Sequence, residues 1–172
     1  MEKVIIRKAT EKDAKQILEI YKYYILNTAI TFEIEIPSLE SFTERIKNIN
    51  NLDLPYLVAV INDKIIGYSY ANKFIARNAC DHAVETTIYI DKEYTKLGIG
   101  KLLYSKLEEE LKTKNITNLY ALVATTETVN KYLDNSSVSF HEHLGYKIIG
   151  QAHNCAKKFD TYFNMVWMEK FI

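Results

Sequence analysis

A single carboxylate stands in an otherwise apolar and β-branched stretch at residues 84–90, which runs Val-Glu-Thr-Thr-Ile-Tyr-Ile. If Glu85 is half-buried in a strand, the loss of water raises its pKa toward neutrality, and such a carboxylate is a suitable general base. The alternative is a Glu that points outward from a half-exposed strand and has no chemical role. Glu85 is therefore the first candidate for proton transfer.

A short glycine-containing segment, Lys96-Leu97-Gly98-Ile99-Gly100-Lys101, follows that stretch and precedes an amphipathic run of leucines. A helix N-terminus offers unpaired N–H groups and a positive dipole end, and glycine lets a ligand approach the backbone, so the segment could hold a pyrophosphate. It matches neither GxxxxGK[ST] nor GxGxxG, which weakens ATP hydrolysis and dinucleotide binding as functions. An ordinary strand-to-helix turn remains the alternative.

The elements that must position these residues alternate along the chain. Apolar alternation and β-branched runs predict strands, and apolar residues three and four apart predict helices. The predicted strands cover residues 4–7, 56–61, 64–72, 84–90, 119–123, 146–150 and 162–168, and the predicted helices cover about 11–27, 38–49, 101–111 and 137–144. Asn62-Asp63 suits a tight hairpin turn, and Gly145 suits the end of the last helix. This order favours a mixed sheet with helices on both faces.

Composition limits the classes of function. The length of 172 residues fits one domain, spanning residues 1–172. Basic and acidic residues both number 22, so the charge gives no footprint for nucleic acid or an anionic membrane. No apolar run approaches the roughly 20 residues that cross a bilayer, and no signal peptide is apparent. Cys80 and Cys155 are expected to be free thiols in a cytoplasmic protein, and the four scattered histidines give no metal-ligand spacing.

Three segments resemble one family. Residues 76–90 (ARNACDHAVETTIYI), 96–100 (KLGIG) and 137–146 (SVSFHEHLGY) are similar to segments of the phosphinothricin acetyltransferases, members of the GCN5-related N-acetyltransferase (GNAT) superfamily. The likeness runs from Ile6 to Met168; the glycine motif marks the superfamily, and residues 76–90 are more specific. The resemblance implies the GNAT fold. That is an α/β (α+β) fold with a mixed, mostly antiparallel central sheet of about six or seven strands and helices on both faces.

The resemblance also implies a reaction and a site. The enzyme would acetylate the α-amino group of a small amino-acid-like compound, of the phosphinothricin or methionine sulfoximine or sulfone type, by direct transfer from acetyl-CoA in a ternary complex. Glu85 and His141 fall on the catalytic positions. The implied acetyl-CoA contacts are the backbone of Ile88, Tyr89 and Ile90, the pyrophosphate segment Lys96, Leu97, Gly98, Ile99, Gly100 and Lys101, and Asp134. No metal is implied, and a homodimer is expected.

Each remaining candidate has a chemical role and a plainer alternative. His141 would protonate the departing thiolate or orient a water, or else it is a structural histidine. Arg77 would pair with a carboxylate or phosphinate of the substrate, or else it is a solvated loop residue. Phe32 and Phe74 would wall the substrate pocket, or else they belong to the core.

The chain departs from the family pattern at several positions. Thr95 stands where the superfamily usually has Gln or Arg, and Cys80 replaces a frequent Tyr. Asp134 takes the place of an Asn that Asn135 could supply after a one-residue slip. Two other functions therefore stay open. One is a protein or peptide Nα-acetyltransferase, which would need an open groove, and the other is a non-catalytic acyl-CoA-binding module.

Overall fold

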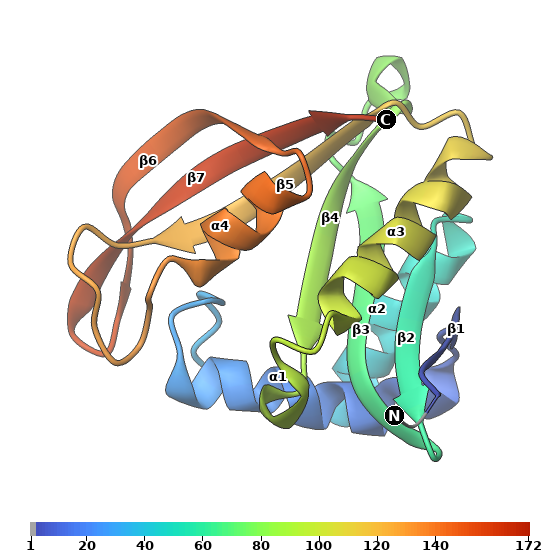
Figure 1. Cartoon of the computed structure of the whole chain (residues 1–172), viewed down its shortest axis with the longest axis horizontal. Coiled ribbons are helices and arrows are strands. Elements are labelled where there is room, and N and C mark those ends of the chain that lie inside the picture. Colours follow the sequence, from blue (N-terminus) through green and yellow to red (C-terminus); the bar gives the residue numbers. More distant parts are fainter. Residues whose placement is uncertain (1–2) are drawn as a thin grey trace.

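The computed structural model describes residues 3–172 and contains one seven-stranded sheet (Figure 1). The strands are β1 (Ile5–Lys8), β2 (Tyr56–Ile61), β3 (Lys64–Lys73), β4 (Ala83–Ile90), β5 (Asn118–Thr125), β6 (Lys147–Lys158) and β7 (Thr161–Phe171). Their order across the sheet is β1-β2-β3-β4-β5-β7-β6. Only β4 and β5 pair in parallel, so the predicted mixed and mostly antiparallel sheet is confirmed.

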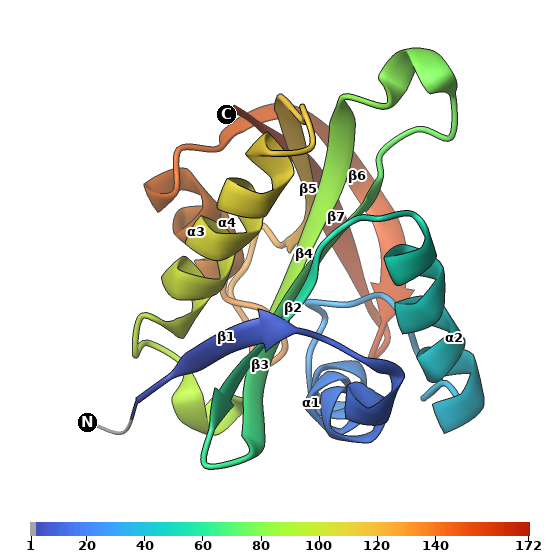
Figure 2. The same ribbon diagram turned by 90° about the vertical axis from the view of Figure 1, so that its right-hand side faces the viewer.

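Helices cover both faces of this sheet (Figure 2). On one face lie α1 (Ala14–Asn27) and α2 (Leu39–Asn51), and on the other lie α3 (Ile99–Lys112) and α4 (Ser136–His143). Short 3-10 turns occur at Glu11–Asp13, Asn78–Cys80 and Lys92–Tyr94. Because both sides of the strands are covered, the sheet has one apolar core under α3 and another under α1 and α2. The predicted order of strands and helices is confirmed.

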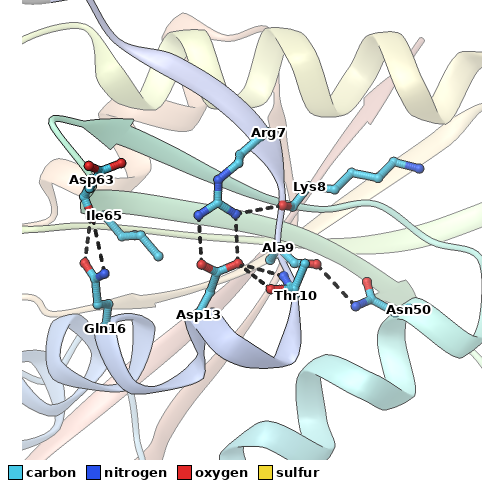
Figure 3. A network of polar contacts seen from close by, with 9 residues as sticks. All are labelled: Arg7, Lys8, Ala9, Thr10, Asp13, Gln16, Asn50, Asp63 and Ile65. Atoms are coloured by element: carbon cyan, nitrogen blue, oxygen red, sulfur yellow. Dashed lines mark hydrogen bonds and ion pairs between the residues drawn. The ribbon is translucent and has the colours of Figure 1, made fainter.

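The start of α1 is fastened to β1 by an ion pair (Figure 3). Arg7 donates two hydrogen bonds of 2.8 Å to the carboxylate of Asp13, which also accepts from the backbone N–H of Thr10 at 2.8 Å. Thr10 and Asp13 thus form a capping box at the start of the helical segment. The Arg7 guanidinium lowers the pKa of Asp13 below its ordinary value. One turn further on, Gln16 accepts from the backbone N–H of Ile65 at 2.9 Å, which holds α1 against β3.

Local turn residues behave as expected, but the last hairpin is longer than predicted. Asn62 and Asp63 have φ values of 46° and 63°, and Gly145 ends α4 with φ 92°. The predicted strands at 146–150 and 162–168 are, in the structure, β6 and β7, of 12 and 11 residues. β6 is an edge strand with two register shifts, so its apolar alternation is broken and the sequence pattern ends too early.

The parallel pair β4 and β5 separates after a short contact. Their register runs only from Ala83–Asn118 to Glu85–Tyr120, and beyond it the two strands diverge (Figure 1). The loop after α1 packs into this opening, where Ala29 contacts Ala124 and Phe163 in a third, small core. Among the described residues, no helix combines the length and apolar character needed to span a membrane.

Candidate active site

A cavity of about 240 Å³ lies where β4 and β5 diverge. Residues 85–89 of β4 and 121–124 of β5 line its two sides, residues 30–32 of the loop after α1 close it, and Ser137 and His141 of α4 reach it from the opposite face. Of the residues predicted from the sequence, Glu85, Ile88, Tyr89, His141 and Phe32 are brought together here. Segments far apart in the chain therefore meet at one opening in the sheet.

Glu85 lies on the α1 side of β4. Side chains alternate along a strand, and Tyr89 contacts Tyr21 of α1 while Val84 packs in the core under α3. The Glu85 side chain is half-buried and lines the cavity, and burial alone raises its pKa above the ordinary value. The environment expected for a general base is present, and its role as the base stays a prediction.

His141 is buried, with only 4% of its surface exposed, and both ring nitrogens have partners. Nδ1 lies 2.7 Å from the carbonyl oxygen of Ser137, and Nε2 lies 3.1 Å from the hydroxyl of Tyr104. A carbonyl only accepts, so the hydrogen of the neutral ring is on Nδ1, and Nε2 accepts from Tyr104. Burial lowers the pKa of His141 below its ordinary value, which favours this uncharged form.

A second hydrogen-bonded pair stands beside His141. The Thr86 hydroxyl donates to the carbonyl of Tyr120 at 3.2 Å, so its oxygen accepts from the hydroxyl of Tyr146, 3.0 Å away. Tyr104 and Tyr146 both contact the His141 ring. None of Thr86, Tyr104 and Tyr146 is among the site residues predicted from the sequence. Tyr104 lies on the apolar face of α3, and a tyrosine hydroxyl among apolar residues is the sequence feature that could have identified it.

The backbone of β4 is open toward the cavity. The N–H of Asp91 donates to Ile66 on β3 at 2.8 Å, so alternation turns the even-numbered backbone groups of β4 away from β3. Ile88 therefore presents its N–H and C=O beyond the end of the β5 register. The carbonyl of Ile90 points the same way but accepts from the hydroxyl of Tyr24 at 2.5 Å. Of the three predicted backbone contacts, Ile88 is thus the best placed to meet a ligand.

The glycine segment forms the N-terminus of α3. Lys96 and Gly98 have φ values of 61° and 80°, and a Cβ at Gly98 would meet no atom within 4 Å, so the loop is open there. A Cβ at Gly100 would come within 2.9 Å of the Phe140 ring, which explains why only glycine lets α3 approach α4. Lys96, Leu97 and Lys101 are exposed beside the unpaired N–H groups of the first turn. This arrangement fits an anionic ligand such as a pyrophosphate.

Asp134 and Asn135 hold the start of α4. Asp134 is exposed and accepts from the backbone N–H of Ser136 at 3.0 Å; bonds from Ser136 and the nearby Lys96 lower its pKa. Asn135 spans the backbone of Thr126, accepting from its N–H at 2.9 Å and donating to its carbonyl at 2.8 Å. Since both ends of that amide are used, Asp134, which lies near Lys96, is the better candidate of the two for a contact to the cofactor.

Two predicted substrate residues do not line the cavity. Arg77 is exposed in the loop between β3 and β4 and does not line the cavity. Phe74 stacks on Tyr120, with ring centroids 3.9 Å apart, next to Glu85 in the β4–β5 register. The loop between β3 and β4 leaves the sheet at the end where β4 begins, which keeps Arg77 away from the opening. Within residues 3–172, no group of three or more His, Cys, Asp and Glu side chains could hold a metal ion.

Comparison with known proteins assigns this chain to a domain family. The chain matches the acetyltransferase (GNAT) domain family over residues 6–167, and it belongs to that family. It is therefore an acetyltransferase, and the resemblance stated from the sequence is confirmed.

Several individual proteins and solved structures are similar to this chain over most of its length. Phosphinothricin N-acetyltransferase of Streptomyces coelicolor is 29% identical over 97% of this chain and 95% of its own length. The structure of a GNAT superfamily phosphinothricin acetyltransferase from Sinorhizobium meliloti, solved in complex with AcCoA, has a TM-score of 0.89 at 28% identity, covering 98% of this chain and 88% of that one. Ribosomal-protein-alanine N-acetyltransferase from Brucella melitensis has a TM-score of 0.88 at 25% identity, covering 98% and 99%. The relatives thus share an acetyl-transfer fold but differ in the acceptor that their names give.

Proposed function

We propose that this chain transfers the acetyl group of acetyl-CoA to the α-amino group of a small amino-acid-like acceptor, by direct attack in a ternary complex. The observation that carries the proposal is the half-buried carboxylate of Glu85 at the opening between β4 and β5, beside the unpaired backbone of Ile88. The similarity to phosphinothricin acetyltransferases supports a small acceptor, and the cavity of about 240 Å³ would admit one.

The donor would lie along the α3 side of the opening. The N–H groups at the start of α3, with Lys96 and Lys101 beside them, would bind the pyrophosphate, and the Ile88 backbone would pair with the pantetheine arm. Acetyl-CoA supplies an activated thioester there. Asp134 lies near Lys96, and its place in the fold suits a contact to the same ligand.

Proton transfer would begin at Glu85. An α-ammonium group must lose a proton before its nitrogen can attack, and a carboxylate with a raised pKa accepts that proton directly or through one water. Negative charge then develops on the thioester oxygen, and the N–H of Ile88 is the nearest donor on the open edge of β4. The Glu85 side chain reaches the cavity from the α1 face of β4, whereas the N–H of Ile88 lies in the plane of the sheet at its open edge.

His141 is our candidate for protonating the departing thiolate. In the resting arrangement its Nδ1 hydrogen is held by Ser137 and its Nε2 by Tyr104. Donation would require the ring to leave one of these partners, so we expect a smaller contribution from His141 than from Glu85.

A thiol-release assay with acetyl-CoA tests the proposal. The acceptors are phosphinothricin, methionine sulfoximine, methionine sulfone, common amino acids, polyamines and a peptide with a free N-terminus. Release with the small amino acids supports it, and release with the peptide alone would move the chain to the peptide Nα-acetyltransferase alternative. Binding of acetyl-CoA without transfer to any amine would favour the non-catalytic module.

A homodimer belongs to the same proposal. Large apolar side chains remain exposed on the strands beyond β5, among them Ile148, Ile149, Tyr162 and Phe171, with Leu122 on β5 itself. A second copy of the chain would cover part of this surface. Light scattering of the wild type and of Ile149→Glu tests this. The wild type should be a dimer, and a monomer in both cases would contradict the proposed homodimer.

A further inference from the structure

A buried lysine from the last hairpin contacts the loop that closes the cavity. Lys158 is the last residue of β6, and the two turn residues that follow it, Phe159 and Asp160, have φ values of 51° and 54°. Only 5% of the surface of Lys158 is exposed. Its Nζ donates to the carbonyl oxygen of Thr31 at 2.8 Å, a contact between residues 127 apart in sequence. The reaction proposed above assigns Lys158 no role.

The Lys158 ammonium has no carboxylate partner. Within residues 3–172, its Nζ forms no ion pair, and its other contact is the ring of Phe159, whose centroid lies 5.2 Å away. Glu33 acts on it only from a distance and is itself paired with Arg45 at 2.7 Å. Lysine is almost never buried unless it is paired. A neutral donor would satisfy the Thr31 carbonyl at a lower desolvation cost, so the charge needs a further explanation.

The carbonyl that Lys158 holds belongs to the cavity wall. Residues 30–32 all line the cavity on the side where Glu85 lies, and Thr31 is the middle one of the three. The Tyr21 hydroxyl of α1 lies 2.8 Å from the Thr31 hydroxyl and fixes its side chain. Lys158 fixes its backbone from the opposite direction. The wall of the cavity is therefore held between α1 and the β6–β7 hairpin.

We propose that Lys158 is a positioning residue for the acceptor: through the Thr31 carbonyl, its ammonium holds residues 30–32 in the conformation that binds the acceptor beside Glu85. Lys158 does not line the cavity and acts through the loop. A hydrogen bond from an ammonium is about twice as strong as one from a neutral N–H, so protonated Lys158 holds the loop more firmly. The inference rests on the proposed function for the identity of the bound group, whereas the hold on the loop can be measured without transfer.

The surroundings of Lys158 give this contact a pH dependence of its own. Burial lowers the pKa of Lys158 from 10.5 to about 8. The titratable side chains on the elements around it are Glu33 on the loop, Tyr21 on α1, Tyr132 after β5, and Lys157 and Asp160 in the hairpin. Lys157 and Asp160 are exposed and pair with each other at 3.4 Å. Burial raises the pKa of Tyr21 to about 12, so Tyr21 keeps its proton while Lys158 loses one.

Steady-state kinetics test the inference with the amine that the wild type acetylates fastest. Lys158→Met removes the donor and should raise the acceptor KM about tenfold near neutral pH, the value of one hydrogen bond. The KM for acetyl-CoA and kcat should stay close to the wild-type values, because the α3 side of the opening is untouched. Lys157→Met, one residue earlier and exposed, is the matched control and should change none of the three. A loss of kcat with an unchanged acceptor KM would contradict the inference.

A second variant tests the role of the charge. Lys158→Gln keeps a neutral N–H donor, so its acceptor KM should exceed that of the wild type about threefold near neutral pH. The two values should converge above the pKa of Lys158, about 8, because the wild type then also has a neutral donor. Their ratio at each pH cancels the titration of Glu85 and of the acceptor amine, which both proteins share. A constant ratio would overturn the role of the ammonium, and this comparison decides the point if Lys158→Met does not fold.

Hydrogen exchange of residues 28–33 measures the hold on the loop without any transfer. Exchange should be about tenfold faster in Lys158→Met than in the wild type and unchanged in Lys157→Met, because a lost tether lowers the free energy of local opening. If Lys158→Met matches its control in both exchange and acceptor KM, the inference is wrong and the proposed function stands. If the wild type acetylates no amine, the proposed function fails, and wild-type exchange in Lys158→Met would overturn the inference independently.

Discussion

Tyrosines pack on both faces of the central sheet, but their hydroxyl groups are in different states. On the α3 side, Tyr104 and Tyr146 are buried and hydrogen-bonded, one to His141 and the other to Thr86. On the α1 side, Tyr56 and Tyr68 are equally buried, but their hydroxyls have no partner within residues 3–172. Tyr104 and Tyr146 therefore have their hydrogen bonds made within the fold, whereas Tyr56 and Tyr68 on the other face do not.

The charged and titratable groups follow the same division. His141 on the α3 side is held neutral by burial and by two hydrogen bonds. Glu85 on the α1 side is half-buried, and burial alone perturbs its pKa. Perturbed groups cluster at functional sites, but a perturbed group whose bonds are all made also occurs in structural networks. The α1 face, on which Glu85 lies, is thus the face where we propose that the acceptor binds.

The largest effect is expected from Glu85→Gln. Loss of the base should lower kcat about 100- to 10,000-fold, while acetyl-CoA affinity stays close to that of the wild type. Steady-state kinetics and calorimetry measure the two quantities. Glu93→Gln, on an exposed carboxylate after β4, is the control and should leave kcat unchanged. Wild-type turnover in Glu85→Gln would remove Glu85 from the mechanism.

The same carboxylate gives a pH dependence with a definite sign. Activity should fall about tenfold per pH unit below the raised pKa of Glu85, and that limb should be absent in Glu85→Gln. The folded protein binds this proton more tightly than the unfolded chain does, so the contribution of Glu85 to stability is lost as the pH rises through the raised pKa. Glu85→Gln should therefore raise the melting temperature at neutral pH but not in acid. If Glu85→Gln and the wild type have equal melting temperatures both at neutral pH and in acid, the burial argument is wrong.

The next largest effect is expected from Gly100, where α3 packs against α4. Gly100→Ala places a Cβ 2.9 Å from the Phe140 ring, beside His141. Overpacking of this kind costs about 1–3 kcal/mol, which exceeds the roughly 0.5–1 kcal/mol that alanine gains in a helix. Urea unfolding should show the net loss, and KM for acetyl-CoA should rise. Gly150→Ala is the control, since its Cβ would meet nothing within 4 Å, and it should leave both quantities unchanged.

The sequence predicts the order of the helices and strands better than it predicts how the two faces of the sheet differ. Periodicity and turn residues such as Asn62 and Gly145 are local, so strand and helix order follow from them. Glu85 could be selected because a carboxylate in an apolar strand is conspicuous. Arg77 was placed at the substrate by resemblance, yet it is exposed and away from the cavity, because the path of a loop depends on packing that no local pattern encodes.

The tyrosines could not be sorted from the sequence for the same reason. Tyr56, Tyr68 and Tyr104 all occur in apolar stretches, and only the folded structure decides which hydroxyl meets a partner. The hydrogen bond between Tyr104 and His141 joins residues 37 apart in sequence on two different helices, and no local sequence pattern predicts it.

The smallest effect comes from making one chemical change on both faces. Tyr104→Phe leaves the buried Nε2 of His141 without its donor, so it should cost about 1 kcal/mol and lower the melting temperature by roughly 2–4 °C. Tyr56→Phe removes a hydroxyl that has no partner within residues 3–172, so its melting temperature should equal or exceed that of the wild type. Differential scanning calorimetry of the two variants decides the point. Equal losses would mean that the Tyr56 hydroxyl is bonded in solution, and the contrast between the two faces of the sheet would then disappear.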